Sequence, residues 1–175
     1  VLESAYIRIP WFIVNLFTAV MSAAVVANFE STIAKVVSLS SVMSIVTGMG
    51  GNAGTQSLTI LCRGLSLGEV DKDNAIQIFC KEVVVGILTG IVIGIIVAIG
   101  AWWFASNPWF GLVAGLAMVL NMLAANIAGY LVPVILKRLN VDPALASGVF
   151  VTTVTDCMGF FFFLGLATLF LPLLV

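Results

Sequence analysis

Histidine is absent from this 175-residue chain, and charged side chains make up only 9% of it. The missing imidazole removes a common metal ligand and the commonest general base. A soluble domain usually carries about a quarter charged residues, so the low charge excludes an ordinary water-soluble domain. The net charge of −1 gives no reason to expect a nucleic-acid partner, and the sequence has no basic patch.

Cysteine is also scarce, with three residues at Cys62, Cys80 and Cys157. An odd number of scattered cysteines argues against a disulfide framework and against a metal cluster. We interpret them as small buried apolar side chains.

Apolar residues fill the chain instead, at 62% of the sequence with a mean hydropathy of +1.23. This composition indicates an integral membrane domain. In hydrocarbon the backbone must satisfy its own hydrogen bonds, which leaves helix bundles or closed barrels. Barrel strands alternate over about ten residues, whereas the apolar runs here exceed twenty residues. The sequence therefore predicts an all-α membrane protein with a single transmembrane domain over residues 1–175.

Five membrane-spanning helices are predicted, since about 20 apolar residues cross a bilayer. The Asn107–Pro108 pair should end one helix before the next begins. Asp142 should cap the last helix, with Pro143 at its first position. The charges of segment 63–82 are interpreted as a solvated cytoplasmic face. The predicted helices cover residues 9–29, 36–62, 83–104, 110–136 and 143–171.

Basic residues predict the orientation, because cytoplasmic ends carry the excess of Lys and Arg. Lys35 stands alone on one side of the five predicted helices, so the N-terminus should be cytoplasmic and the C-terminus outside. We expect a multi-pass protein of the cell membrane, namely the bacterial inner membrane. The chain begins at Val1, and we expect it to be a domain of a longer protein. The basic residues on the other side are Arg8, Arg63, Lys72, Lys81, Lys137 and Arg138.

Asp156 is the one acidic residue expected deep in the bilayer, 13 residues after Pro143, or roughly 20 Å along a helix. Such a residue costs about 2.5–3.5 kcal/mol. The predicted spans offer no Lys or Arg to pair with it. It is therefore either protonated and bonded to another helix, or it faces water and a cation. The Phe-rich opposite side suits lipid. Small and polar residues share its helical face, namely Gly148, Thr152, Thr155 and Gly159.

The second predicted helix contains the sequence TGMGGNAGTQSLT at 47–59. Its glycines, each costing about 1 kcal/mol in a helix, predict an irregular backbone beside a watery cavity. Carbonyl groups freed there are candidate cation ligands. Alternatively, the small residues serve only close packing. One face of this helix is polar and carries Ser41, Ser44, Gly48, Asn52, Thr55 and Thr59.

The third and fourth predicted helices carry small residues that indicate helix packing. Asn121 and Asn126 are costly in lipid, so they either line an ion path or bond between helices. The small residues are Gly86, Gly90, Gly94 and Ala98 in the third helix and Gly111 and Gly115 in the fourth.

Two motifs, GGNAGTQS followed by Arg63 and DPALASG…VTTVTD before a Phe-rich helix end, resemble the transmembrane domain of the MgtE family of magnesium channels. The resemblance implies five helices per protomer, a homodimer with a pore on its axis, and no enzymatic activity. It implies Asp156 as the principal ion-binding residue, with Gly51, Asn52 and the backbone at Thr152 beside it. A departure lies at residues 148–149, where many family members carry Asn or Gly followed by Pro.

In a two-fold dimer, two copies of Asp156 would meet near the axis and supply a charge of −2. Mg²⁺ keeps several waters, so we expect a hydrated ion, with Mn²⁺ or Co²⁺ as alternatives. The family resemblance also implies a cytoplasmic N-domain and CBS domains as partners in the full-length protein. Three alternative functions are an ion-coupled secondary transporter of divalent cations, an intramembrane aspartyl protease and a structural subunit in contact with lipid. The Gly-x-Gly-Asp signature of such proteases is absent from the sequence.

Overall fold

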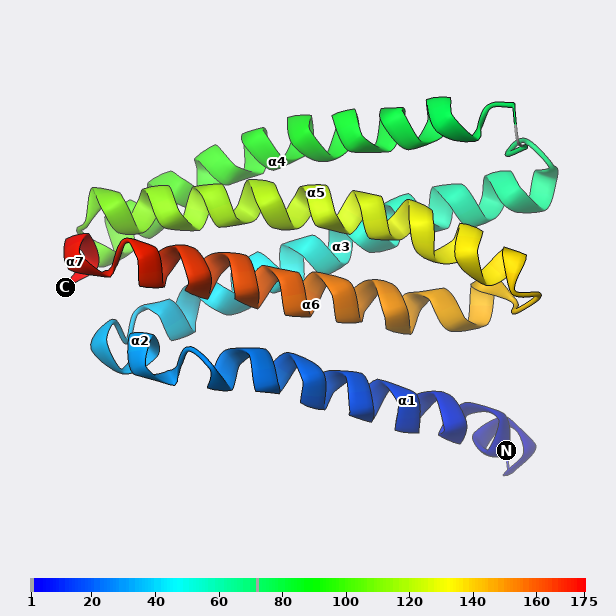
Figure 1. Cartoon of the computed structure of the whole chain (residues 1–175), viewed down its shortest axis with the longest axis horizontal. Helices are drawn as coiled ribbons and strands as arrows, with labels where there is room; N and C mark the ends of the chain where they lie inside the picture. The colour runs from blue at the N-terminus through cyan, green and yellow to red at the C-terminus, as the bar shows by residue number, and fades with distance from the viewer. Residues whose placement is uncertain (1, 72) are drawn as a thin grey trace.

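The computed structural model describes residues 2–71 and 73–175, except for the side chains of residues 2–5, 7 and 144–146. All regular structure in these residues is helical, which confirms the predicted all-α class. Five long helices lie side by side along the long axis of the molecule, and two short helices lie at one end (Figure 1). The helices are α1 (Leu2–Ala27), α2 (Glu30–Lys35), α3 (Leu39–Leu67), α4 (Ala75–Ala105), α5 (Pro108–Arg138), α6 (Pro143–Leu169) and α7 (Leu171–Leu174).

Helix α5 occupies the centre of the bundle, where it packs against α3, α4 and α6, while α1 packs against α6 (Figure 1). The rings of Phe110 on α5 and Phe163 on α6 meet edge to face with their centroids 6.4 Å apart. Both side chains are almost fully buried. The Phe-rich end of α6 therefore does not face lipid alone, because Phe163 belongs to the core.

Small residues allow α4 and α5 to approach closely. A Cβ added at Gly94 would lie 2.9 Å from the carbonyl oxygen of Gly115, and one added at Gly115 would lie 2.8 Å from Cβ of Ala98. At Gly90 the nearest atom, Cα of Val119, would be 3.2 Å away. These contacts confirm that this glycine series serves helix packing.

The helix breaks predicted at the two Pro motifs are confirmed, although the helix after Asn107 begins at Pro108 rather than at residue 110. Helix α4 ends at Ala105, and Ser106 is left-handed with a φ of 52°. The side-chain oxygen of Asn107 then accepts a hydrogen bond of 2.9 Å from the Trp109 amide, which caps α5. Helix α6 begins at Pro143, as expected for a proline in the first turn.

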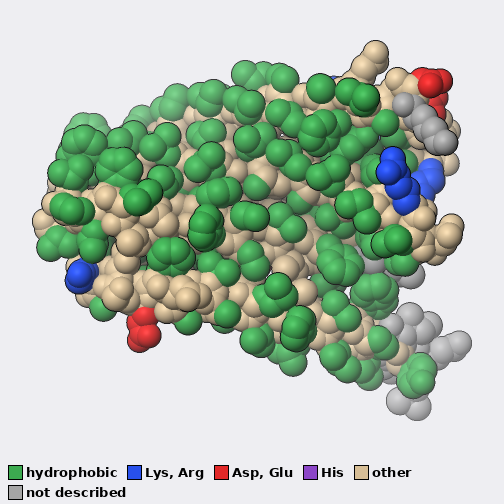
Figure 2. All heavy atoms as spheres, viewed as in Figure 1, with side chains coloured by type: hydrophobic (Ala, Val, Ile, Leu, Met, Phe, Trp, Pro, Cys, Tyr) green, Lys and Arg blue, Asp and Glu red, His purple; other side chains and the backbone are tan. Residues whose placement is uncertain are grey.

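Within the described residues, four helices are long and apolar enough to cross a membrane, namely α1 from Arg8 onward, α4, α5 and α6 from Ser147 onward. Helix α3 is equally long, but its polar residues leave it outside this set. On the face drawn in Figure 2, apolar side chains cover the length of the molecule and the charged ones gather at its two ends. This surface is that of a membrane protein. The fifth span and the orientation stay predictions.

The segment 63–82 is not one solvated loop, contrary to the prediction. Helix α3 continues to Leu67, and α4 begins at Ala75 rather than at residue 83. Contacts with α5 hold these extra turns, because Tyr130 donates a hydrogen bond of 2.7 Å to the carbonyl of Ala75, and its ring packs against that of Phe79 at 58°, with the centroids 5.4 Å apart. As a result Glu82 lies inside α4 and is buried.

The cysteines are all free, as expected. Cys80 is exposed on α4, and Cys62 and Cys157 are only half-buried, so the expectation that all three are buried is wrong.

Candidate functional site

Asp156 lies in the middle of α6, and its side chain is half-buried. It has no hydrogen-bond or ion-pair partner within the described part of the chain. Its two neighbours in sequence define its direction. Thr155 lies against α3, because a Cβ added at Gly51 would be 3.8 Å from its hydroxyl oxygen. Cys157 contacts Ser22 of α1 at 3.4 Å. Since successive residues turn by about 100° around a helix, the side chain of Asp156 points away from α6 in a direction between the contact of α6 with α3 and its contact with α1.

One face of α6 is open toward the start of the helix and closed toward its end. Gly148 is exposed, with nothing within 4 Å of an added Cβ. Thr152 and Asp156, one and two turns further on, are half-buried. At the next turn Gly159 is buried, and an added Cβ there would lie 2.7 Å from the amide nitrogen of Asn121 and 2.8 Å from Thr47. Asp156 therefore occupies the last open turn before α3 and α5 close over α6.

The polar face predicted for the second span is present on α3, and its side chains are uncovered in the single chain. Gly51 does not belong to this face, because it packs toward Thr155 of α6. The structure thus brings Gly51 next to the residue that precedes Asp156, and it leaves Asn52 exposed on the neighbouring face. The exposed residues of the polar face are Ser41, Ser44, Gly48, Asn52, Thr55 and Thr59.

The irregular backbone predicted for residues 47–59 is absent, since α3 is continuous from Leu39 to Leu67. In a continuous helix each carbonyl accepts the amide four residues later, so the backbone offers no freed carbonyl ligands there. The carbonyl of Gly51 accepts a further bond of 2.8 Å from the Thr55 hydroxyl. The glycines instead allow close packing, because a Cβ at Gly54 would lie 2.7 Å from Val151 of α6 and 3.3 Å from the Ala125 carbonyl of α5.

Thr152, the fourth predicted site residue, is also in continuous helix. Its hydroxyl donates to the carbonyls of Gly148 at 2.9 Å and Val149 at 3.0 Å, and its own carbonyl accepts from the Thr155 hydroxyl at 3.0 Å. The hydroxyl oxygen keeps its acceptor capacity on the open face of α6.

The two asparagines of α5 have different roles. Asn121 is fully buried, and its amide donates a 2.8 Å bond to the carbonyl of Val46 on α3, while its side-chain oxygen has no partner among the described residues. Asn126 donates to Met122 within α5 at 2.8 Å, and it also borders a cavity. Asn121 therefore bonds between helices, and Asn126 lines a space.

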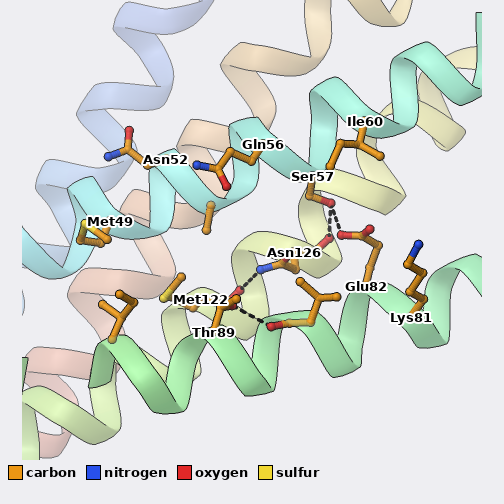
Figure 3. A pocket seen from close by; sticks show the side chains of 13 residues that line it. Met49, Asn52, Gln56, Ser57, Ile60, Lys81, Glu82, Thr89, Met122 and Asn126 are labelled. Carbon is orange, nitrogen blue, oxygen red and sulfur yellow. Dashed lines mark hydrogen bonds between the residues drawn. The ribbon is translucent and has the colours of Figure 1, made fainter. Parts of the chain in front are cut away.

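That cavity, of about 370 Å³, lies between α3 and α4 over α5, and sequence analysis missed its acidic residue, Glu82 (Figure 3). The Ser57 hydroxyl donates a 2.6 Å hydrogen bond to Glu82 across this space. The sequence does contain a pattern that could have indicated this burial. Glu82 lies four residues before Gly86, so it extends the packed series Gly86, Gly90 and Gly94 along one face of α4. We name this space, lined on its polar side by Asn52, Gln56, Ser57, Lys81, Glu82, Thr89 and Asn126, the α3–α4 crevice.

No group of three or more Cys, Asp or Glu side chains is close enough to hold a metal ion within the described residues. Each acidic residue at the bundle centre is therefore a single carboxylate among neutral oxygens. Such donors suit a hard cation that keeps part of its water shell, and they do not suit a tightly held, fully dehydrated metal.

Comparison with known proteins gives a consistent result. The family model MgtE, described as a divalent cation transporter, matches residues 43–166. The magnesium transporter MgtE of Bacillus subtilis is 36% identical over 96% of this chain, and that of Enterococcus faecalis is 36% identical over 97%. The Thermus thermophilus protein of the same name is 32% identical over 94% of the chain.

The chain spans little more than a third of the length of these relatives, between 36% and 38%. The family match covers most of the present chain, including all of α4 and α5 and almost all of α3 and α6. The chain belongs to the MgtE family of divalent cation transporters.

Proposed function

We propose that this chain is the pore domain of a magnesium channel, which conducts hydrated Mg²⁺ down its electrochemical gradient without enzymatic chemistry. The observation that carries this proposal is Asp156, a carboxylate in the middle of an apolar helix, half-open and without a partner in the described residues. The relatives named as magnesium transporters support Mg²⁺ as the ion. Mn²⁺ and Co²⁺ accept the same oxygen ligands and remain alternative ions.

A homodimer would complete the pore. The polar face of α3 is exposed in an otherwise apolar surface, and it lies beside the open turn of Asp156. Polar groups facing lipid are costly, so a second copy of the chain, enclosing water, would relieve this exposure. With α3 counted as a fifth span, the distribution of basic residues places the N-terminus in the cytoplasm and the C-terminus outside. A cytoplasmic N-domain and CBS domains are the expected partners in the full-length protein.

Within this pore each residue has a distinct role. The paired Asp156 carboxylates attract the divalent ion and accept hydrogen bonds from its waters. Asn52 and Thr152 supply neutral oxygens beside them, and Gly51 lies against Thr155 of α6. With two carboxylates and otherwise neutral oxygens, binding stays weak enough for the ion to leave. A potential of 100 mV contributes about 4.6 kcal/mol to the entry of a divalent ion.

The test is Mg²⁺ uptake into proteoliposomes that carry a magnesium-sensitive dye. Asp156→Asn should keep the helical content and lose most of the flux, because the amide carries no charge. Asp73→Asn, in the exposed segment between α3 and α4, is the matched control and should conduct like the parent. Equal flux in Asp156→Asn and the parent would refute the site. Flux that requires a Na⁺ or H⁺ gradient would instead establish a coupled transporter.

A further inference from the structure

The α3–α4 crevice contains an acidic side chain to which the proposed pore assigns no role. Glu82 is only 9% exposed, and one of its carboxylate oxygens accepts the 2.6 Å bond from Ser57. Figure 3 shows the two side chains pointing toward each other from α4 and α3. Ser57 is 3.4 Å from the carbonyl oxygen of Asn126 as well, so its hydroxyl is shared.

This carboxylate lacks a cationic partner among the residues that the structure describes. Lys81 borders the same crevice, but its side chain is exposed and forms no ion pair with Glu82. A buried carboxylate is costly unless a cation or several hydrogen bonds compensate it. One hydroxyl donor leaves most of its acceptor capacity unused.

We propose that the α3–α4 crevice binds a hydrated divalent cation at Glu82, at a site separate from Asp156. The cavity volume of about 370 Å³ equals on the order of twelve waters at about 30 Å³ each, which accommodates an ion with a six-water shell. Apart from the exposed Lys81, the other polar groups are neutral hydroxyls and amides, so the ion is held mainly through its waters. Such a site is weak and exchanges rapidly.

The position of Glu82 along α4 places the crevice site nearer to one end of the bundle than Asp156. It lies seven residues into α4, roughly 10 Å from the start of the helix, whereas Asp156 lies roughly 20 Å into α6. Both helices start at the same end of the bundle (Figure 1). Asn52 borders the crevice and also belongs to the polar face of α3. If the proposed pore is correct, Glu82 concentrates cations at this end of the route.

Paramagnetic broadening by Mn²⁺ locates the ion without relying on flux. The full chain is labelled with ¹⁵N at Asn and Gln side chains, placed in nanodiscs and titrated with MnCl₂. The amides of Gln56 and Asn126, which line the crevice, should broaden at lower Mn²⁺ concentrations than that of Asn107, which caps α5 at the opposite end. Asn52 is not used, since it lies near both sites.

Glu82→Gln should abolish this selective broadening, because the amide still accepts the Ser57 bond but carries no charge. Lys81→Gln removes a nearby positive charge from an exposed position and should lower the apparent Kd by about twofold to fivefold. Unchanged broadening in a folded Glu82→Gln variant would overturn the proposal, as would unchanged binding in Lys81→Gln.

Asp156→Asn separates this proposal from the proposed pore. It should keep the broadening of Gln56 and Asn126 while it loses Mg²⁺ uptake. If uptake survives in Asp156→Asn and the broadening still depends on Glu82, the pore assignment fails and the crevice site stands. If the broadening disappears in Asp156→Asn, the two sites are one and the crevice proposal is wrong.

Discussion

Replacing Gly54 by alanine tests the contact between α3 and α6 that positions Asp156. The added Cβ would lie 2.7 Å from Cγ1 of Val151, 3.3 Å from the carbonyl oxygen of Ala125 and 3.4 Å from Cγ2 of Thr155. Carbon atoms in contact prefer about 3.5–4.0 Å, so α3 and α6 must separate by about 1 Å or Val151 must leave its rotamer. A β-branched side chain in a helix has one strongly preferred χ1, and the Ala125 oxygen belongs to the backbone.

The same substitution at Gly48 is the matched control, because this glycine lies on the same helix with nothing within 4 Å of an added Cβ. Both variants gain about 1 kcal/mol of helix propensity, which cancels in their difference. Overpacking usually costs about 1–3 kcal/mol. We therefore expect the free energy of unfolding of Gly54→Ala to lie about 1–3 kcal/mol below that of Gly48→Ala.

The assay is reversible unfolding in mixed micelles with increasing SDS, followed by far-UV circular dichroism. Two variants with equal unfolding free energies would show that α3 and α6 are not in contact at Gly54, and the described surroundings of Asp156 would then be wrong. A Gly48→Ala variant less stable than the parent would show that this position is covered.

Two further substitutions test contacts at the two ends of the bundle. Tyr130→Phe keeps the ring against Phe79 but loses the 2.7 Å hydrogen bond to the Ala75 carbonyl. The free energy of unfolding should therefore fall by about 1 kcal/mol in the same SDS titration. An unchanged value would place the start of α4 elsewhere. Asn107→Ala removes the cap on the Trp109 amide and the 3.0 Å hydrogen bond to the Leu173 carbonyl. It should lower the free energy of unfolding by about 0.5–2 kcal/mol and speed hydrogen exchange at the Trp109 amide. Slow exchange at this amide in the variant would contradict the cap.

Local rules predicted the parts of this fold that depend on a few neighbouring residues. Asn107 and Pro108 end one helix and start the next, and Pro143 begins α6, because a proline restricts its own φ and the residue before it. Spacing alone also predicted that Gly90 and Gly94 serve helix packing, and the structure shows that the helix packed against them is α5. Each of these features requires no knowledge of what lies on the far side of the bundle.

Glu82 was not predicted, and the reason is physical. A charge next to other charges indicates a membrane boundary, and Glu82 follows Lys81 at the end of the most polar segment. Its burial depends on Ser57, 25 residues earlier, and on the packing of Phe79 against Tyr130. Contacts of this kind between distant segments cannot be read from hydropathy along the chain.

The glycines of α3 illustrate the same limit at the candidate site. The motif offered two interpretations, broken backbone or close packing. The continuous helix supports packing at Gly54, where α5 and α6 approach, whereas Gly51 makes only an ordinary contact of 3.8 Å with Thr155. Gly48, in the same motif, touches nothing and lies on the polar face. Periodicity assigns these glycines to different faces but does not say what covers each face. A helix packed through one face and left polar on another leaves that second face to water or to a second chain, and this uncovered face beside Asp156 is the physical reason to expect the pore between two copies.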